Sequence, residues 1–90
     1  MQKEAFVGSI VYSKAGRDCG TCYIIVRFGD NGYAFVANGI DKKLAAPKRK
    51  NIKHLELSGE VNETIREKLL AEKQVFDSEI KSALRAYSGK

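Results

Sequence analysis

The loop of residues 14–20 brings basic side chains and glycines together in the order Lys-Ala-Gly-Arg-Asp-Cys-Gly. Gly16 and Gly20 allow the backbone to turn sharply and to come close to a ligand. The side chains of Lys14 and Arg17 can pair with phosphate oxygens, and the loop amides can add neutral hydrogen-bond donors. The loop therefore predicts contact with a phosphate-bearing ligand. The alternative is a plain hairpin turn whose charges are solvated.

A second basic segment spans residues 42–54 and contains no acidic residue between Lys42 and Lys53. Clusters of this kind commonly follow a nucleic-acid backbone, because each neutralised phosphate releases condensed counterions. A solvated loop is the alternative. The candidate phosphate contacts of this segment are its six basic residues, Lys42, Lys43, Lys48, Arg49, Lys50 and Lys53.

The charge of the chain is distributed unevenly. Residues 1–57 carry ten basic and five acidic side chains, whereas residues 58–90 carry six of each. The whole net charge of +5 therefore belongs to the first part of the chain. An excess of this kind on one part indicates a polyanion-binding surface there.

The two cysteines, Cys19 and Cys22, have the Cys-X-X-Cys spacing and leave three interpretations open. A thioredoxin-like redox pair is followed by a helix, but a β-rich run follows Cys22. A structural zinc needs four ligands, and His54 is the one His of the chain, so the ion would have to be shared between two copies. We expect two reduced thiols, with no metal and no cofactor.

An enzyme is not expected. The chain has one His and no Trp, and no nucleophile, base and acid occur with a meaningful spacing. Its carboxylates are concentrated in residues 58–90, where they alternate with basic residues.

Residues 1–57 contain a series of short strand-like runs separated by turn signals. β-Branched and aromatic residues predict strands over 7–13, 21–28 and 33–37. Two shorter strands are expected over 44–46 and 52–57, in a part of the chain with weaker signals. Asn31-Gly32 has the residues of a tight hairpin turn, and Pro47 suits a strand end. Alternation places Phe28 on the same face as Val26. Short antiparallel strands joined by tight turns predict a small barrel over 1–57.

Residues 61–87 contain no Gly or Pro, and their apolar residues recur at helical spacing. The sequence therefore predicts a long amphipathic helix within 58–90, in the same domain as the barrel. A straight helix over 61–87 would be about 40 Å long, whereas a domain of this size is nearer 25 Å across. The helix must either break near residues 72–74 or overhang the barrel. An overhanging apolar stripe predicts a homodimer.

Three tyrosines, Tyr12, Tyr23 and Tyr33, lie on predicted strands. Such side chains can stack on unpaired bases, but they more often complete a core.

The run from Gly8 to Val26, with Gly16-Arg17-Asp18-Cys19-Gly20 at its centre, resembles a KOW motif. This strand–loop–strand signature occurs in RNA-binding modules of ribosomal proteins and of NusG-type elongation factors. The chain is similar to small bacterial KOW-domain proteins related to KOW-containing proteins of the large ribosomal subunit. The resemblance implies an SH3-like barrel over about 7–57.

The resemblance also implies that the loop residues Lys14, Gly16, Arg17 and Gly20 meet structured RNA. Ribosomal RNA, or the ribosome itself, is the expected partner, recognised through its backbone and shape. A protein-interaction module of the transcription or translation machinery is the alternative, because some KOW domains bind proteins.

The sequence contains no run of roughly 18 apolar residues and no apolar core of a signal peptide at its N-terminus. A soluble, cytoplasmic protein that does not bind membranes is therefore expected.

Overall fold

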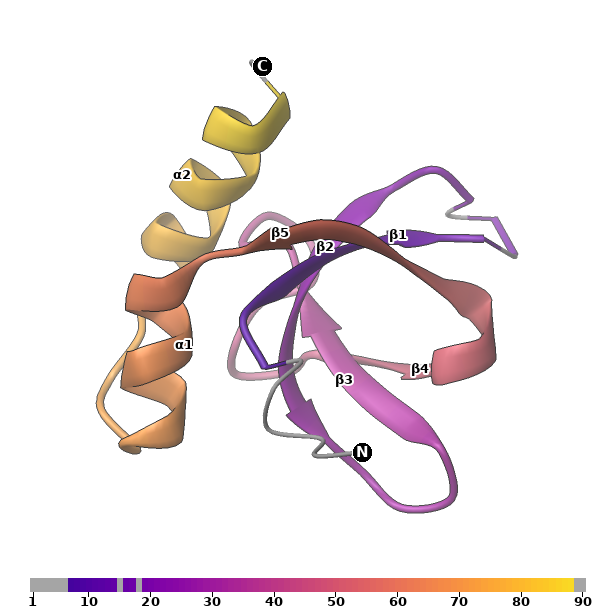
Figure 1. The fold of residues 1–90 in the computed structure, drawn as a ribbon, viewed down its shortest axis with the longest axis horizontal. Coiled ribbons are helices and arrows are strands. Elements are labelled where there is room, and N and C mark those ends of the chain that lie inside the picture. Colours follow the sequence, from indigo (N-terminus) through magenta and orange to yellow (C-terminus); the bar gives the residue numbers. More distant parts are fainter. Residues whose placement is uncertain (1–6, 15, 18, 89–90) are drawn as a thin grey trace.

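The computed structural model describes residues 7–88, except residues 15 and 18. This part of the chain forms a five-stranded antiparallel sheet with two α-helices along one side of it (Figure 1). Along the chain, the elements are β1 (Ser9–Ser13), β2 (Cys22–Phe28), β3 (Tyr33–Ala37), β4 (Lys48–Asn51), the 3₁₀ helix η2 (Ile52–His54), β5 (Leu55–Val61), α1 (Glu63–Leu70) and α2 (Asp77–Ser88).

The strands lie in the order β4-β3-β2-β1-β5, and every neighbouring pair is antiparallel. The predicted mainly β fold with a helical C-terminal part is thus confirmed at this level. β4 and β5 are the two edges of the sheet, so strand pairing does not close it into the predicted barrel.

The first three predicted strands are confirmed, as is the hairpin turn between β2 and β3. Asn31 and Gly32 both have positive φ, at 58° and 79°. The N–H of Tyr33 donates to the carbonyl of Asp30 over 3.2 Å and closes the turn. Asn-Gly is the residue pair that tolerates this backbone at the lowest cost, which is why the sequence identified the hairpin.

The predicted face of Phe28 is wrong. Ile24 and Val26 pack toward the helices as expected, but Phe28 packs against the core on the opposite face of the sheet. The pairing of β2 with β3 slips between Ile25 and Arg27. A slip of this kind is a β-bulge, which inserts one residue and reverses the alternation beyond it.

The fourth and fifth strands differ from the prediction. Residues 44–46 form a turn, in which the N–H of Ala46 donates to the carbonyl of Lys43 over 3.0 Å. The N–H of Leu44 donates to Oδ1 of Asp77 over 2.7 Å and ties this segment to α2. The strand β4 begins only after Pro47. Residues 52–54 are the 3₁₀ helix η2, and β5 runs on to Val61. Within β5, Leu55 is buried, whereas Leu57 is 52% exposed.

The predicted continuous helix is broken into α1 and α2. Glu72 has a left-handed φ of 57°. The N–H groups of Glu72 and Lys73 donate to the carbonyls of Leu69 and Lys68 over 3.2 and 2.8 Å. These two bonds form a Schellman motif, which ends a helix. The break is therefore the correct one of the two alternatives left open by the sequence.

The two short helices remain within a molecule of 29 × 29 × 24 Å. An ion pair of 2.5 Å between Lys68 on α1 and Glu79 on α2 connects the two helices across the turn between them. The overhang of a straight helix, which was the reason to expect a homodimer, does not arise. The homodimer itself stays a prediction.

The sheet carries a hydrophobic cluster on each face. The helix-side cluster is built from Ile10, Ile24, Val26, Ala37, Ile65, Ile80 and Leu84. The cluster on the other face consists of Val11, Tyr23, Ile25, Ala34, Val36 and Leu55. Both faces of the central strands are thus buried, and polar side chains concentrate at the loops, on the edge strands and on the outer sides of the helices. Among the described residues, no helix is long and apolar enough to cross a membrane.

Candidate nucleic-acid interface

The β1–β2 loop turns on two glycines. Gly16 and Gly20 have φ values of 85° and 90°, and the N–H of Gly20 donates to the carbonyl of Ser13 over 2.8 Å. Both conformations are left-handed, where a side chain would be strained. The side chains of Lys14 and Arg17 are exposed. The described residues of the predicted loop are therefore confirmed as an exposed turn; its Ala15 and Asp18 lie outside the described residues.

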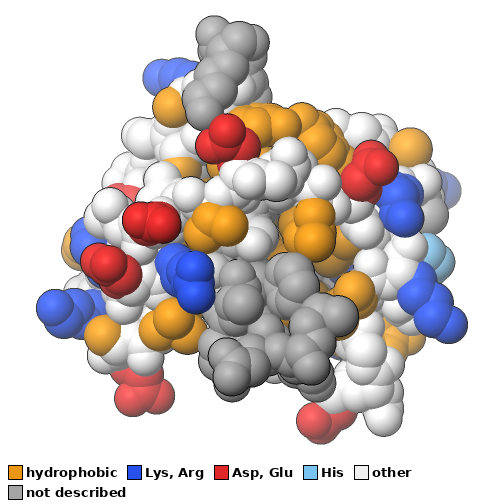
Figure 2. Space-filling view, viewed as in Figure 1, with side chains coloured by type: hydrophobic (Ala, Val, Ile, Leu, Met, Phe, Trp, Pro, Cys, Tyr) orange, Lys and Arg blue, Asp and Glu red, His pale blue; other side chains and the backbone are white. Residues whose placement is uncertain are grey.

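The loop meets the connection between β4 and β5. The backbone N–H of Lys14 donates to the carbonyl of His54 over 2.7 Å. This bond brings the exposed residues Lys53 and His54 of η2 next to the loop, at the end of the sheet away from the helices (Figure 1). Figure 2 shows basic side chains, with an acidic one beside them, along this edge of the molecule. The sequence predicted Lys14, Arg17 and Lys53 separately, and the fold places them at one end.

A shallow depression of about 570 Å³ lies at the base of the loop. Its lining comes from β1, from the loop and from β5: Tyr12, Ser13, Lys14, Cys19, Gly20 and Glu56. Glu56 is exposed and is the acidic residue in this lining. Its carboxylate sets one limit to where a phosphate can lie, because like charges repel each other.

The strand β4 directs the side chains of the basic run Lys48-Arg49-Lys50 to opposite faces of the sheet. Successive side chains of a strand point to opposite faces. Lys50 is only 8% exposed, and its Nζ atom donates to Oγ of Ser13 over 2.9 Å. Lys48 is half-buried, whereas Arg49 is exposed on the other face. Lys50, which the sequence placed among the phosphate contacts, is therefore a buried residue and is not part of an exposed surface.

Lys42 and Lys43 lie in the connection between β3 and β4. The side chain of Asn38 holds this turn, since its Oδ1 atom accepts from the N–H groups of Ile40 and Lys42, both over 3.0 Å. Its amide also donates to Asp41 over 2.7 Å, and this hydrogen bond lowers the pKa of the Asp41 carboxyl. A carboxylate thus lies next to these lysines and offsets part of their charge. They belong to a loop anchored on α2 and not to the cluster around Lys14.

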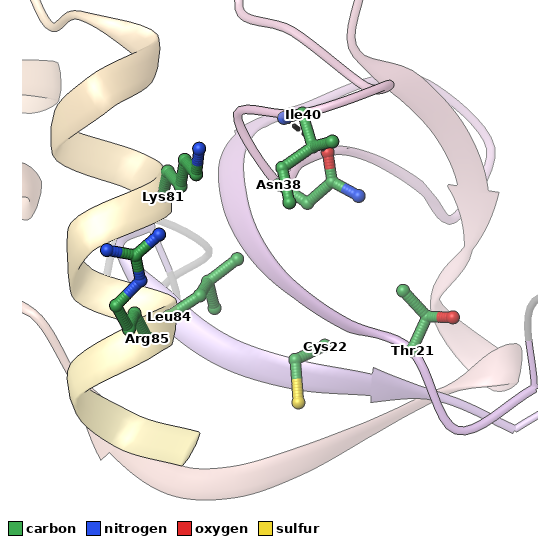
Figure 3. Close-up of a pocket in the computed structure, with 7 residues that line it drawn as sticks. All are labelled: Thr21, Cys22, Asn38, Ile40, Lys81, Leu84 and Arg85. Atoms are coloured by element: carbon green, nitrogen blue, oxygen red, sulfur yellow. Dashed lines mark hydrogen bonds between the residues drawn. The ribbon is translucent and has the colours of Figure 1, made fainter. Parts of the chain in front are cut away.

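A pocket of about 250 Å³ lies between α2 and the sheet (Figure 3). Thr21, Cys22, Asn38, Ile40, Lys81, Leu84 and Arg85 line it. Burial raises the pKa of the Cys22 thiol. A raised pKa lowers the fraction of this sulfur that is present as the thiolate, the reactive form of a cysteine. The lining of the pocket is largely apolar, and Lys81 and Arg85 of α2 add two basic side chains to it.

The cysteines do not form a metal centre with other described residues. Cys19 is exposed in the loop, and Cys22 begins β2 with its side chain partly buried against the helix-side cluster. Among the residues that the structure describes, no group of three or more His, Cys, Asp and Glu side chains could hold an ion.

Two arginine–aromatic pairs were not identified from the sequence. The guanidinium carbon of Arg27 lies 4.2 Å from the ring centroid of Phe35, and that of Arg49 lies 4.4 Å from the ring centroid of Tyr33. Finding these pairs requires the strand register: the first depends on the bulge in β2, which has no sequence signal, and the second depends on the pairing of β3 with β4. Of the other tyrosines, Tyr23 is buried and Tyr12 is hydrogen-bonded through its hydroxyl to Tyr87.

No protein-family model matches the chain, and no protein of curated function matches its sequence.

Proposed function

We propose that this chain is a non-enzymatic RNA-binding protein of the KOW type, with structured RNA such as ribosomal RNA as its ligand. The observation that carries the proposal is the bond between Lys14 and His54, which groups three exposed cations, Lys14, Arg17 and Lys53, at one end of the sheet. Cations grouped in this way neutralise successive phosphates. Gly16 and Gly20 let an RNA backbone approach the loop amides closely.

The fold supports a small, strongly curved SH3-like barrel as the scaffold of this loop. Only the three residues of η2 connect the edge strands β4 and β5, so the two edges approach each other at this corner. The side chain of Lys50 on β4 reaches Ser13 on β1, although β3 and β2 lie between these strands in the sheet. Pairing slips between Ser9 and Val11, and again in β2, add the bends that such a curl needs.

The RNA contacts that we propose are a subset of the residues predicted from the sequence. Lys14, Gly16, Arg17, Gly20 and Lys53 form the primary contact surface. Arg49 extends it along β4, and Lys42, Lys43 and Lys48 contribute more distant charge. Lys50 is left out because it is buried.

The salt dependence of binding tests this function. Affinity for a ribosomal RNA fragment should fall steeply between about 50 and 200 mM salt, since each neutralised phosphate adds about 0.9 to the log–log slope. The triple variant Lys14→Ala/Arg17→Ala/Lys53→Ala should weaken binding and lower that slope by about two to three. Lys73→Ala, an exposed charge in the turn between α1 and α2, is the control and should bind as the wild type does. An affinity for RNA that does not change with salt, or that is the same in the triple variant as in the wild type, contradicts the function.

A second candidate is docking of a protein partner, either another component of the translation or transcription machinery or a second copy. The observation in its favour is that Phe76 and Leu70, near the turn between the helices, are 55% and 46% exposed. Apolar contacts survive high salt, whereas phosphate contacts do not. Crosslinking in cells, followed by identification of the attached RNA or protein, separates the two candidates.

A further inference from the structure

A row of exposed arginines over half-buried aromatic rings crosses three strands on one face of the sheet. Arg27 of β2 is opposite Phe35 of β3, and Phe35 is opposite Arg49 of β4. Residues directly opposite in a ladder have their side chains on the same face. Tyr33 lies two residues before Phe35 and shares that face. We call these four residues, Arg27, Tyr33, Phe35 and Arg49, the arginine–aromatic face.

The guanidinium groups of this face lie over the rings. Arg27 is 4.2 Å from the centroid of Phe35, and Arg49 is 4.4 Å from that of Tyr33. Gly29 makes room for the Phe35 ring, because a Cβ atom at Gly29 would be only 2.9 Å from it. The rings thus fix the arginine planes before any ligand arrives, which lowers the entropy cost of binding.

Both arginines remain open to a ligand. Each side chain is exposed, and within the described part of the chain neither is paired with a carboxylate. A guanidinium that rests on a ring with one side offers its other side to a second planar group. Its N–H groups stay free to bind phosphate at the edges. A nucleotide combines a planar group with a phosphate and would match both contacts.

From these contacts we propose that the arginine–aromatic face binds unpaired bases of single-stranded RNA, stacked on the planes of Arg27 and Arg49. This inference rests on the proposed RNA-binding function and adds a second subsite to it. Arg49 and Lys53 are four residues apart, which limits their Cα separation to about 14 Å. A strand of a few nucleotides leaving the β1–β2 loop can therefore reach the face. Duplex RNA cannot, because its bases are already stacked on each other.

The double variant Arg27→Lys/Arg49→Lys tests the stacking directly, because it keeps both positive charges and removes both planar guanidinium groups. The probes are an unstructured RNA of about 12 nucleotides that carries 2-aminopurine, and a blunt duplex of the same length. Loss of stacking should weaken binding of the single strand about tenfold or more and should abolish the change in 2-aminopurine fluorescence that accompanies binding. Affinity for the duplex should stay within about twofold of the wild type.

The same exchange at an exposed arginine of α2, Arg85→Lys, is the matched control and should change neither affinity. Arg49→Lys alone, on the edge strand β4, gives a second measurement if circular dichroism shows that the double variant is not folded. If the folded lysine variants bind the single strand and change the 2-aminopurine fluorescence as the wild type does, charge alone is sufficient and the stacking site is wrong, while the proposed function stands. If the wild type binds neither RNA in a salt-dependent manner, the proposed function fails and the stacking site fails with it.

Discussion

Lys50 on the edge strand β4 donates a hydrogen bond of 2.9 Å to the Oγ atom of Ser13 on β1, although two strands lie between them in the sheet. Both residues are buried, at 8% and 2% exposure. The contact therefore spans the inside of the curved sheet and ties one edge to the centre. It explains why a lysine from a run of basic residues is buried.

Lys50→Met should lower the free energy of unfolding by about 1–3 kcal/mol, because it leaves the buried Ser13 hydroxyl without this partner. Urea unfolding followed by circular dichroism measures the loss. Adding Ser13→Ala should recover part of it, since removing both partners costs less than removing one. Lys73→Met, at an exposed position, should change stability by less than about 0.5 kcal/mol. Equal effects of the two lysine variants would contradict the buried contact.

Glu72→Gly should stabilise the protein by about 1 kcal/mol, because glycine adopts the left-handed conformation of residue 72 without strain. Glu72→Val should destabilise it, since a β-branched residue fits that conformation poorly. The midpoint of thermal unfolding reports both changes. Gln74→Gly, two residues further on, is the control and should bring no gain. A loss of stability in Glu72→Gly would mean that the helix is not stopped by the Schellman motif.

Gly39→Ala should be strongly destabilising. The new Cβ atom would lie 2.4 Å from the carbonyl oxygen of Asp77 and 3.0 Å from the N atom of Lys81, at a φ of +78°. Strain and overpacking together predict a loss of roughly 2–4 kcal/mol. Gly59 has a similar φ of +88° with no atom near its missing Cβ, so Gly59→Ala should cost only the strain. Chemical denaturation of the two variants compares them, and the same loss in both would argue against close packing of this turn on α2.

Stability should fall as the pH rises from about 10 to 12, because of Tyr12. Its hydrogen bond with Tyr87, together with burial, raises the pKa of Tyr12 from 10.0 to about 12. A group whose pKa is raised by folding stabilises the protein below its unfolded pKa, and that contribution is lost as pH passes through the folded value. Thermal unfolding between pH 9 and pH 12 measures this, and Tyr12→Phe should flatten the profile. An unchanged profile in the variant would exclude the Tyr12–Tyr87 contact as its cause.

The sequence predicted the first three strands and the β1–β2 loop because their signals are local. Asn31-Gly32 and the apolar run of β2 determine their own conformation. The strand β4 was missed because its residues, Lys48 to Asn51, have no strand-like composition and pair only because β3 offers an edge. The helix break carried no glycine, since a Glu occupies the left-handed position.

The candidate site was also predictable only where its signals are local. Lys14 and Arg17 belong to a loop that the sequence defined by itself. The burial of Lys50 depends on which face of β4 it occupies, and the stacking of Arg27 depends on the bulge in β2. Both are properties of strand register, which arises only when the sheet assembles.

The position of β1 between β2 and β5 has a consequence for synthesis. Residues Ser9 to Ser13 pair with β5 residues as late in the chain as Val61. At ribosomal rates of about 5–20 residues per second, roughly 2–10 s pass between the synthesis of β1 and that of its second partner. During this interval one edge of β1 is unpaired, and unpaired edges recruit strands from other chains. Nascent chains that stop before β5 are therefore the form of this protein with the greatest tendency to aggregate.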